Sequence, residues 1–247
     1  MIQVDLAPGV EAWFTASEFD LATRGGREDL ATHLGYPLVF ANQVHGQDLA
    51  WVTPETLRHA PAPDAFPTAD ALATEVGGIG LVVRTADCVP LLLADPDRGL
   101  VAAVHVGWRG LLAGVAGAAL EELRARGAGQ LRAAVGPAIC GDCYQVGQDV
   151  AKAAQRQGHV TTKGTDGIDR LDVAGSVVRQ LRQAGLAPVS RVEECTAESS
   201  RLFSWRSGRA TGRQGGVIAL AGSHYGRPQH ALATRRAECG QLAGGAA

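Results

Sequence analysis

After residue 70, short apolar runs of strand length alternate with stretches in which apolar residues recur at helical spacing, and this alternation restricts the fold most. It predicts a mixed fold, α/β or α+β, in which strands and helices share one core. Residues 79–84, 89–94 and 100–106 are predicted strands. Because residues 95–99 (DPDRG) have turn chemistry, we expect the second and third strands to form a hairpin.

The same patterns predict helices and strands in the rest of the chain. Apolar residues from Leu112 to Leu123 fall on one face of a predicted helix, with Gly127 as its C-cap. We also expect strands at 131–135, 189–193 and 217–220, a helix at 148–157, and a helix from the N-cap Asp172 to Gly185. Residues 1–221 are predicted to form one domain, and residues 222–247 a C-terminal tail or appendage.

Composition excludes several classes of protein. The chain has 247 residues, of which 46% are hydrophobic and 19% charged, as in a globular protein. A net charge of -2 lacks the basic excess that nucleic-acid binding requires, and no apolar run reaches the roughly 18 residues of a membrane span. Five cysteines and the absence of a signal-peptide pattern predict a cytoplasmic location in a reducing compartment.

The predicted hairpin brings a thiol and an imidazole to one strand end. Pairing Ala94 with Leu100 places Val89 opposite His105, and a shift of one residue places Cys88 there. His45 follows the apolar run 38–40 and is a third candidate at a strand end. Two imidazoles and a thiolate can hold Zn²⁺ with an open fourth position, or they can act as a cysteine nucleophile with a histidine base.

Other candidates carry weaker signals. Arg109, Arg206 and Arg213 lie in glycine-rich loops, where a guanidinium group could receive phosphate or carboxylate. Cys140 and Cys143 form a C-x-x-C pair, but no second pair stands at the spacing of a zinc ribbon, so we interpret them as small core residues. The chain has no P-loop, no G-x-S-x-G motif and no H-E-x-x-H motif.

Seven motifs stand in order along the chain. They are NQVHG at 42–46, ADALAT at 69–74, TADCVP at 85–90, VAAVHVGWRG at 101–110, GPAI at 136–139, CYQVG at 143–147, and CT at 195–196 leading into LFSWR at 202–206 and TGR at 211–213. Together they resemble the YfiH-like family, also called the laccase-domain or multicopper polyphenol oxidase family, whose members are regarded as purine nucleoside phosphorylases. The resemblance covers residues 38–220.

The resemblance implies an α+β fold, a single domain of mixed β-sheets flanked by helices, of the CNF1/YfiH cysteine hydrolase type. It implies that His45, Cys88 and His105 are the catalytic and metal-binding residues, with Zn²⁺ or copper as the ion. The implied activity is phosphorolysis of adenosine, inosine, guanosine and S-methyl-5′-thioadenosine, with adenosine deamination as a second activity. The partners are then purine nucleosides and phosphate.

We assign the substrate or phosphate contacts, as an expectation, to Gln43, Asp87, Arg109 and Arg206. The chain departs from the family pattern near Ser17, and Gln145 and Ser207 leave two of its acidic groups missing, so substrate preference is expected to differ.

Three other functions remain open. A cysteine–histidine pair also suits an amidase that acts on peptidoglycan precursors such as muramoyl-serine. A copper oxidase is disfavoured, because multicopper chemistry needs many more clustered histidines than the seven scattered along this chain provide. A non-catalytic metal-binding protein is the third alternative.

Overall fold

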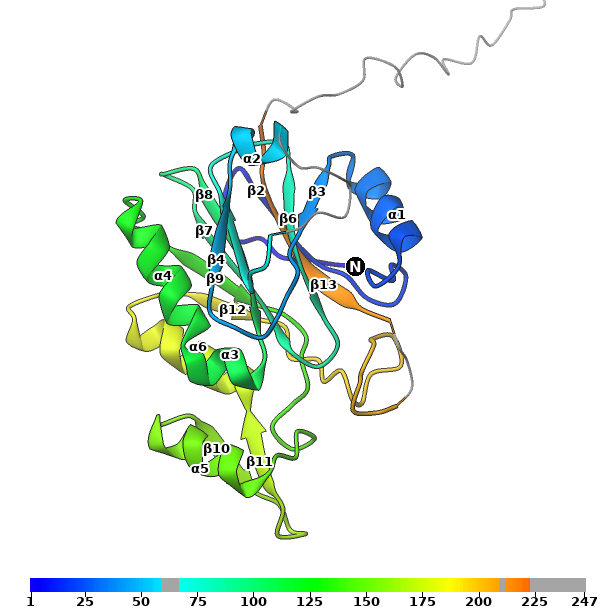
Figure 1. Ribbon diagram of the computed structural model, residues 1–247, viewed down its shortest axis with the longest axis vertical. Helices are drawn as coiled ribbons and strands as arrows, with labels where there is room; N and C mark the ends of the chain where they lie inside the picture. Colours follow the sequence, from blue (N-terminus) through cyan, green and yellow to red (C-terminus); the bar gives the residue numbers. More distant parts are fainter. Residues whose placement is uncertain (59–66, 209–211, 223–247) are drawn as a thin grey trace, which may run out of the picture.

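Two β-sheets lie face to face at the centre of the molecule (Figure 1). The computed structural model describes residues 1–58, 67–208 and 212–222. One sheet has five strands in the order β1 (Ile2–Gln3), β2 (Val10–Phe14), β13 (Gln214–Leu220), β6 (Gly80–Thr85) and β3 (Leu38–Phe40). The other has six, in the order β12 (Val189–Arg191), β9 (Arg132–Val135), β7 (Val89–Asp95), β8 (Leu100–Val106), β5 (Ala71–Thr74) and β4 (Leu49–Val52).

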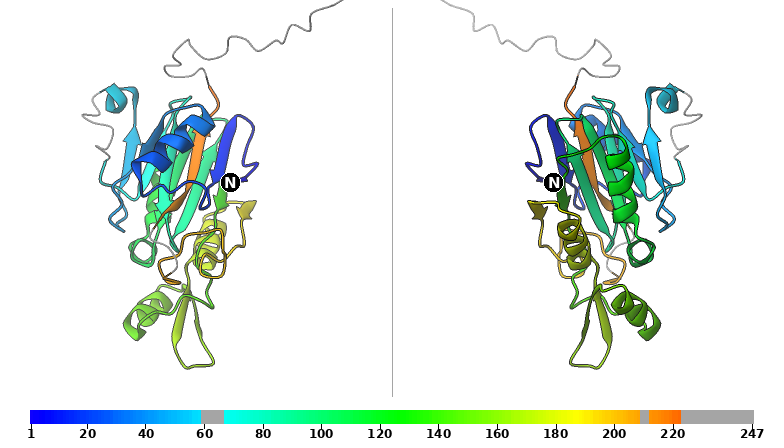
Figure 2. Two further views of the ribbon diagram at one scale, coloured as in Figure 1. Left: turned by 90° about the vertical axis from the view of Figure 1, so that its right-hand side faces the viewer. Right: turned by 90° about the vertical axis from the view of Figure 1, so that its left-hand side faces the viewer.

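Helices cover the outer face of each sheet, and the views in Figures 1 and 2 show them on opposite sides. Leu30 of α1 (Arg24–Leu34) packs on the five-stranded sheet. The six-stranded sheet is covered by α3 (Trp108–Ala113), α4 (Val115–Ala125) and α6 (Val173–Gln183). Outside these layers lie α2 (Pro54–Arg58), α5 (Gln148–Arg156) and a hairpin of β10 (Val160–Lys163) and β11 (Asp169–Asp172).

Burial on both faces explains why the central strands read as unbroken apolar runs. Along β8, Val104 and Val106 face the helices, whereas Val101 and Ala103 face the other sheet. His105 has the parity of Val101 and Ala103, so it points to the layer between the two sheets, at its end. The predicted α+β fold of mixed sheets flanked by helices is confirmed.

Two local predictions were wrong by small amounts. Asp95 belongs to β7 and pairs with Leu100, so His105 stands opposite Pro90, and both sequence-based counts of the hairpin register were shifted. The helix expected through Leu112–Leu123 is two helices, because Gly114 takes a φ of 85° between α3 and α4. The predicted tail lies, except for residue 222, outside the described residues.

The described residues contain no helix with both the length and the apolar character needed to cross a bilayer.

Asp95 explains where the hairpin turn begins. Its carboxylate is 1% exposed and accepts four backbone N–H groups, from Asp97, Arg98, Gly129 and Gln130 at 2.7–3.1 Å. Burial alone would raise the pKa of Asp95, but the backbone donors outweigh burial and lower it. The carboxylate therefore ties the hairpin turn to the loop before β9.

We expect Asp95→Asn to lower the free energy of unfolding by about 2–4 kcal/mol near neutral pH, because an amide cannot accept all four bonds. Since the folded-state pKa is depressed, this stabilisation is present above the unfolded value of about 3.9 and is lost as pH falls through the folded value. Urea unfolding at several pH values measures it. Asp97→Asn, at an exposed neighbour in the same turn, is the control, and equal stability of the two variants would contradict the prediction.

Candidate active site

His45, Cys88 and His105 meet at one end of the two sheets, as the sequence indicated. Their Sγ and ring nitrogen atoms lie within 4.8 Å of one another. Cys88 Sγ is 3.9 Å from His45 Nε2, and the two imidazole rings contact edge to face with centroids 4.8 Å apart. His105 is buried, whereas His45 and Cys88 are partly exposed. A reactant can therefore approach the cluster from one side.

Asp70 holds both histidines. It is fully buried, and its Oδ1 contacts His105 Nδ1 at 2.7 Å and accepts the backbone N–H of His45 at 3.0 Å. Its Oδ2 accepts the N–H groups of Val44 and Gly46. A proton on His105 Nδ1 leaves Nε2 to face the thiol, which is how a carboxylate commonly orients a catalytic or metal-binding histidine.

The cluster favours charge separation between sulfur and imidazole. Burial alone would raise the pKa of Cys88, but hydrogen bonds from His105 and His45 outweigh burial and lower it to about 6. Burial would lower the pKa of His105, yet its bonds to Asp70 and Cys88 raise it to about 9. Near neutral pH the metal-free site holds a thiolate beside an imidazolium.

Two residues at the site have backbone conformations that residues other than glycine rarely adopt. His45 has a φ of 63° and Asp87 a φ of 90°, and among the described residues no other non-glycine residue has a positive φ. Asp70 fixes the first of these by binding three consecutive N–H groups. The second is fixed by the Asp87 carboxylate, which accepts hydrogen bonds from the Thr196 hydroxyl at 2.6 Å and from the Arg206 backbone N–H at 2.8 Å. Strain of this kind concentrates at functional sites.

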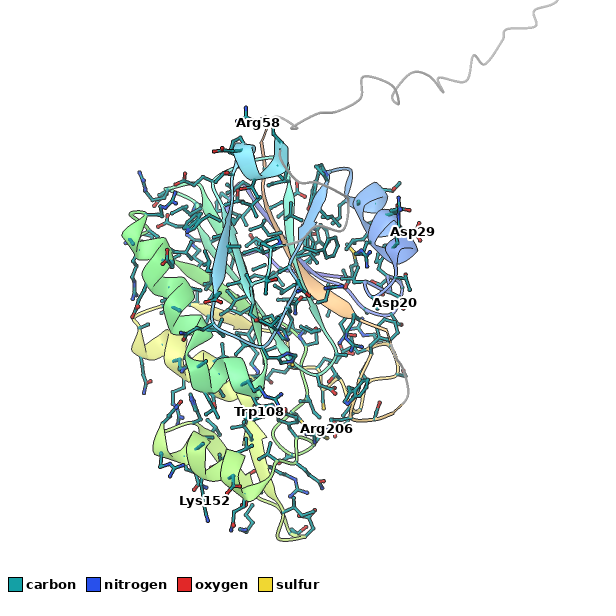
Figure 3. All side chains as sticks on the ribbon, viewed as in Figure 1. Asp20, Asp29, Arg58, Trp108, Lys152 and Arg206 are labelled. Carbon is teal, nitrogen blue, oxygen red and sulfur yellow. The ribbon has the colours of Figure 1, made fainter. Side chains whose placement is uncertain are left out.

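A cavity of about 670 Å³ opens above the cluster. Trp108, Tyr144 and Trp205 supply aromatic surface, and arginines 84, 109, 206 and 213 supply positive charge. Arg109 stacks on Trp108 at 4.4 Å and Arg206 on Tyr144 at 4.6 Å, measured from the guanidinium carbon to the ring centroid. Figure 3 shows Trp108 and Arg206 near each other on this side of the molecule. The cavity suits a ligand with an aromatic part and an anionic part.

Two residues predicted to contact substrate line the cavity but bind the chain itself. The Gln43 amide donates to the Arg84 carbonyl and accepts the Arg84 N–H, both at 2.8 Å. Both carboxylate oxygens of Asp87 are also engaged, as described above. In this conformation Gln43 and Asp87 shape the cavity wall. Arg109 and Arg206 also line the cavity, and Arg206 Nη1 donates to the Gln145 carbonyl at 2.7 Å.

Sequence reasoning missed Asp70 and Arg84. Asp70 was noted only as part of a motif, although a carboxylate directly before the apolar residues Ala71 and Leu72 is unusual in a buried strand. Arg84 interrupts the apolar run of β6, and its pKa is lowered by burial and by Arg27 and Arg213. A charged residue directly before a buried strand in the case of Asp70, and inside one in the case of Arg84, was the available signal.

The donor set fits a metal ion. One thiolate and two imidazoles within 4.8 Å match a three-ligand zinc site with one open position, and Asp70 provides the usual carboxylate behind a ligand histidine. The donor types also suit copper, so they indicate a metal without selecting one.

Gly107 leaves room for this cluster. A Cβ at residue 107 would lie 2.8 Å from His45 Cδ2 and 3.1 Å from Cys88 Sγ. We expect Gly107→Ala to displace the His45 ring while the protein stays folded. The kcat of the reaction catalysed at this cluster should fall roughly 10- to 100-fold. Steady-state kinetics and circular dichroism measure both effects. Gly117→Ala, where an added Cβ meets no atom within 4 Å, is the control, and equal kcat for the two variants would contradict the prediction.

Fold and site thus define an α+β protein of two packed sheets with a His–Cys–His centre beneath an arginine-lined cavity. The family model described as multi-copper polyphenol oxidoreductase laccase matches residues 20–221. The chain belongs to this family, as its motifs indicated.

Named relatives agree with this membership. Purine nucleoside phosphorylase ORF3 of Streptomyces griseus is 41% identical over 208 residues, which cover 81% of this chain and 82% of that protein. Adenosine deaminase RL5, from an unknown prokaryotic organism, is 46% identical over 89 residues, covering 35% of this chain and 34% of that protein. The crystal structure of YlmD from Geobacillus stearothermophilus matches with a TM-score of 0.77 and 30% identity, covering 87% of this chain and 94% of that one.

Proposed function

We propose that the chain is a purine nucleoside phosphorylase whose active site is the cavity above His45, Cys88 and His105. The observation that carries the proposal is the combination of arginine and aromatic side chains around a reactive thiol–imidazole centre. Relatives named purine nucleoside phosphorylase, at up to 41% identity, support it. The proposed substrates are phosphate with adenosine, inosine, guanosine or S-methyl-5′-thioadenosine, and the proposed location is the cytoplasm.

Phosphorolysis breaks the bond from ribose C1′ to the purine nitrogen and forms a bond from C1′ to a phosphate oxygen. The electron pair of the broken bond stays on the purine, which takes up a proton. In this proposal Arg109 and Arg206 hold phosphate, and Arg84 adds positive charge nearby. Trp108 and Tyr144 provide flat surfaces for the purine. The chain thus positions an anion and a nucleoside together.

The centre beneath would hold Zn²⁺ through His45, Cys88 and His105, with copper as the alternative ion. When bound, zinc supplies a Lewis acid and a water of lowered pKa, which is the chemistry that adenosine deamination requires. Asp70 keeps the proton on His105 Nδ1 and so directs Nε2 toward the centre. The partial similarity to adenosine deaminase RL5 supports deamination as a second activity.

The amidase remains the alternative function, because a thiol with a pKa of about 6 beside a histidine can also attack an acyl carbon. Incubation with nucleosides and phosphate, and separately with muramoyl-serine, distinguishes the two functions. Release of purine base and ribose 1-phosphate supports the phosphorylase. Release of serine with untouched nucleosides would replace it with the amidase, and stoichiometric metal without either product would favour a binding protein.

The arginines give the proposal a quantitative test. We expect Arg109→Ala and Arg206→Ala each to raise the KM for phosphate about 10- to 100-fold, because each removes a charge-assisted contact. Initial rates at varied phosphate concentration measure this effect. Arg182→Ala, on the exposed side of α6, is the matched control and should keep its KM. An unchanged KM and kcat in both cavity variants would remove the phosphate assignment.

A further inference from the structure

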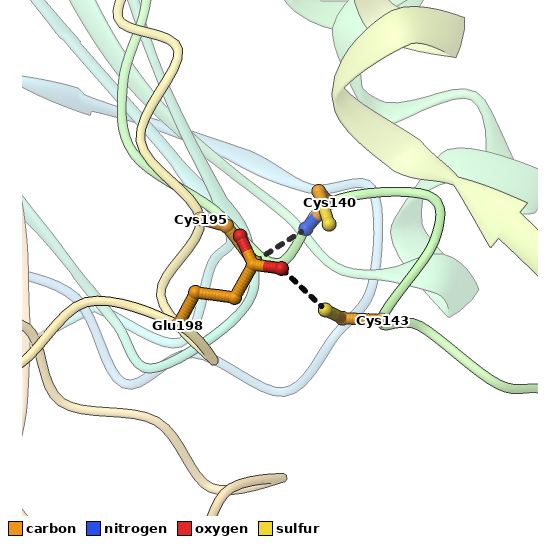
Figure 4. Close-up of side chains that lie close together, drawn as sticks. All are labelled: Cys140, Cys143, Cys195 and Glu198. Atoms are coloured by element: carbon orange, nitrogen blue, oxygen red, sulfur yellow. Dashed lines mark hydrogen bonds between the residues drawn. The ribbon is translucent and has the colours of Figure 1, made fainter.

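A second cluster of ligand atoms lies outside the cavity. Cys140 and Cys143 come from the loop between β9 and α5, and Cys195 and Glu198 from the segment after β12. The three sulfur atoms and a carboxylate oxygen of Glu198 lie within 4.8 Å of one another (Figure 4). Cys143 Sγ is 3.6 Å from Glu198 Oε1. All three cysteines are free thiols and are partly buried, whereas Glu198 is exposed.

The spacing of these residues is that of two ligand pairs. Cys140 and Cys143 stand three residues apart, and so do Cys195 and Glu198. The first pair has no second pair of cysteines at the spacing of a zinc ribbon, which is why we interpret it from sequence as two small core residues. A glutamate completes the second pair, which the spacing rule for zinc ribbons does not recognise.

The backbone holds the two pairs together independently of their side chains. Ala138 and Cys195 form a parallel β-bridge, and the Thr196 N–H donates to the Ala138 carbonyl at 3.1 Å. The Cys140 N–H points at Cys195 Sγ, 3.3 Å away, which is the kind of hydrogen bond that stabilises a metal-bound thiolate. Arg170 Nε donates to the Asp142 carbonyl inside the C-x-x-C loop and brings a positive charge close to the thiols.

We propose that Cys140, Cys143, Cys195 and Glu198 form a second metal site, a four-ligand tetrahedral site for Zn²⁺. Ligand atoms of such a site lie about 3.3–3.8 Å apart, given metal–ligand distances of about 2.0–2.3 Å. Atoms already within 4.8 Å reach this geometry through small side-chain rotations. Binding forms three Zn–S bonds and one Zn–O bond, and the three thiols release their protons to solvent. With four protein ligands the site has no open position, so its role is structural.

The site would tie together two segments that build the active-site wall. Tyr144 follows Cys143 and stacks on Arg206. Thr196 follows Cys195 and donates its hydroxyl to Asp87, the neighbour of Cys88. The metal therefore joins the loop that carries Tyr144 to the segment that leads to Arg206. This inference concerns metal binding and does not depend on the reaction catalysed in the cavity.

The test counts metal in the full chain. Because the fifth cysteine, Cys239, could add a ligand, all variants carry Cys239→Ser. The proteins are reduced, loaded with zinc and desalted, and zinc per chain is measured by mass spectrometry of the element. We expect two zinc ions in the parent, one in Cys88→Ser and one in Cys143→Ser, with none in the double variant. One zinc in the parent, unchanged by Cys143→Ser, would overturn the proposal.

Cobalt distinguishes the two sites in a variant that keeps all four ligands of the proposed site. Charge-transfer absorbance from sulfur to Co²⁺ grows with the number of thiolates, so Cys88→Ser loaded with cobalt should keep most of the parent's absorbance. Glu198→Gln should weaken zinc binding at this site at least tenfold in competition with a chromogenic chelator, since it removes an anionic ligand. Glu193→Gln, an exposed carboxylate nearby, is the control. Loss of nearly all absorbance in Cys88→Ser would contradict the site.

Discussion

Cys88→Ser is expected to reduce kcat/KM for phosphorolysis by roughly a thousandfold or more. Cys88 supplies the only sulfur of the His–Cys–His cluster, and its thiol is the group whose pKa the two histidines lower to about 6. A serine hydroxyl does not ionise in that range and is a weak ligand for zinc. The substitution removes the anionic centre of the site while changing one atom.

Initial rates with inosine and phosphate, after loading with zinc, measure the loss. Thermal unfolding of the metal-free proteins serves as the control, because a one-atom change in a partly exposed side chain should leave their melting temperature nearly unchanged. If kcat/KM stays within tenfold of the parent while the protein remains folded, Cys88 is not part of the reaction centre.

Asp70→Asn is expected to lower kcat by about 100- to 10,000-fold and the free energy of unfolding by about 2–4 kcal/mol. The Asp70 carboxylate receives His105 Nδ1 and three consecutive N–H groups, from Val44, His45 and Gly46. In asparagine one carboxylate oxygen is replaced by an NH2 group. This group is itself a donor and cannot accept hydrogen bonds from the His105 ring or the backbone N–H groups. Both histidines would therefore lose their fixed positions.

A second readout separates positioning from simple destabilisation. Without the carboxylate, the pKa of His105 should fall from about 9, since the anion that favours the imidazolium is gone. Nuclear magnetic resonance of the imidazole nitrogens across pH, in metal-free protein, measures this change. Asp48→Asn, at an exposed carboxylate before β4, is the control. An unchanged His105 pKa in Asp70→Asn would show that the carboxylate does not act through this histidine.

The central hairpin and its helices were predictable, because burial on both faces gives long apolar runs that contrast with helical periodicity. The N-terminal strands were not predicted. Strand β2 is short, and it is stabilised by pairing with β13, about 200 residues later, which leaves no local signal. The register was one residue off because Asp95 looks like a turn residue, yet its carboxylate binds the turn from within the strand.

Convergence of His45, Cys88 and His105 could be predicted from strand ends and from motifs. Asp70 and Arg84 could not be assigned roles, because their importance lies in contacts with residues far along the chain, His105 in one case and Gln43 in the other. Glu198 belongs to the same group, since nothing in the local sequence relates it to Cys140. The sequence pattern of a single strand or helix does not predict contacts between polar side chains that are far apart along the chain.

The place of β13 in its sheet has a consequence for synthesis of the protein. Residues 214–220 lie between β2 and β6, so the middle of the five-stranded sheet is filled by the last strand of the described chain. Until the ribosome has released that stretch, β2 and β6 keep unpaired edges, and the layer beneath them stays open. The nascent chain is therefore expected to depend on chaperones until residues 214–220 have emerged, and truncation before residue 214 should yield aggregates rather than a smaller folded protein.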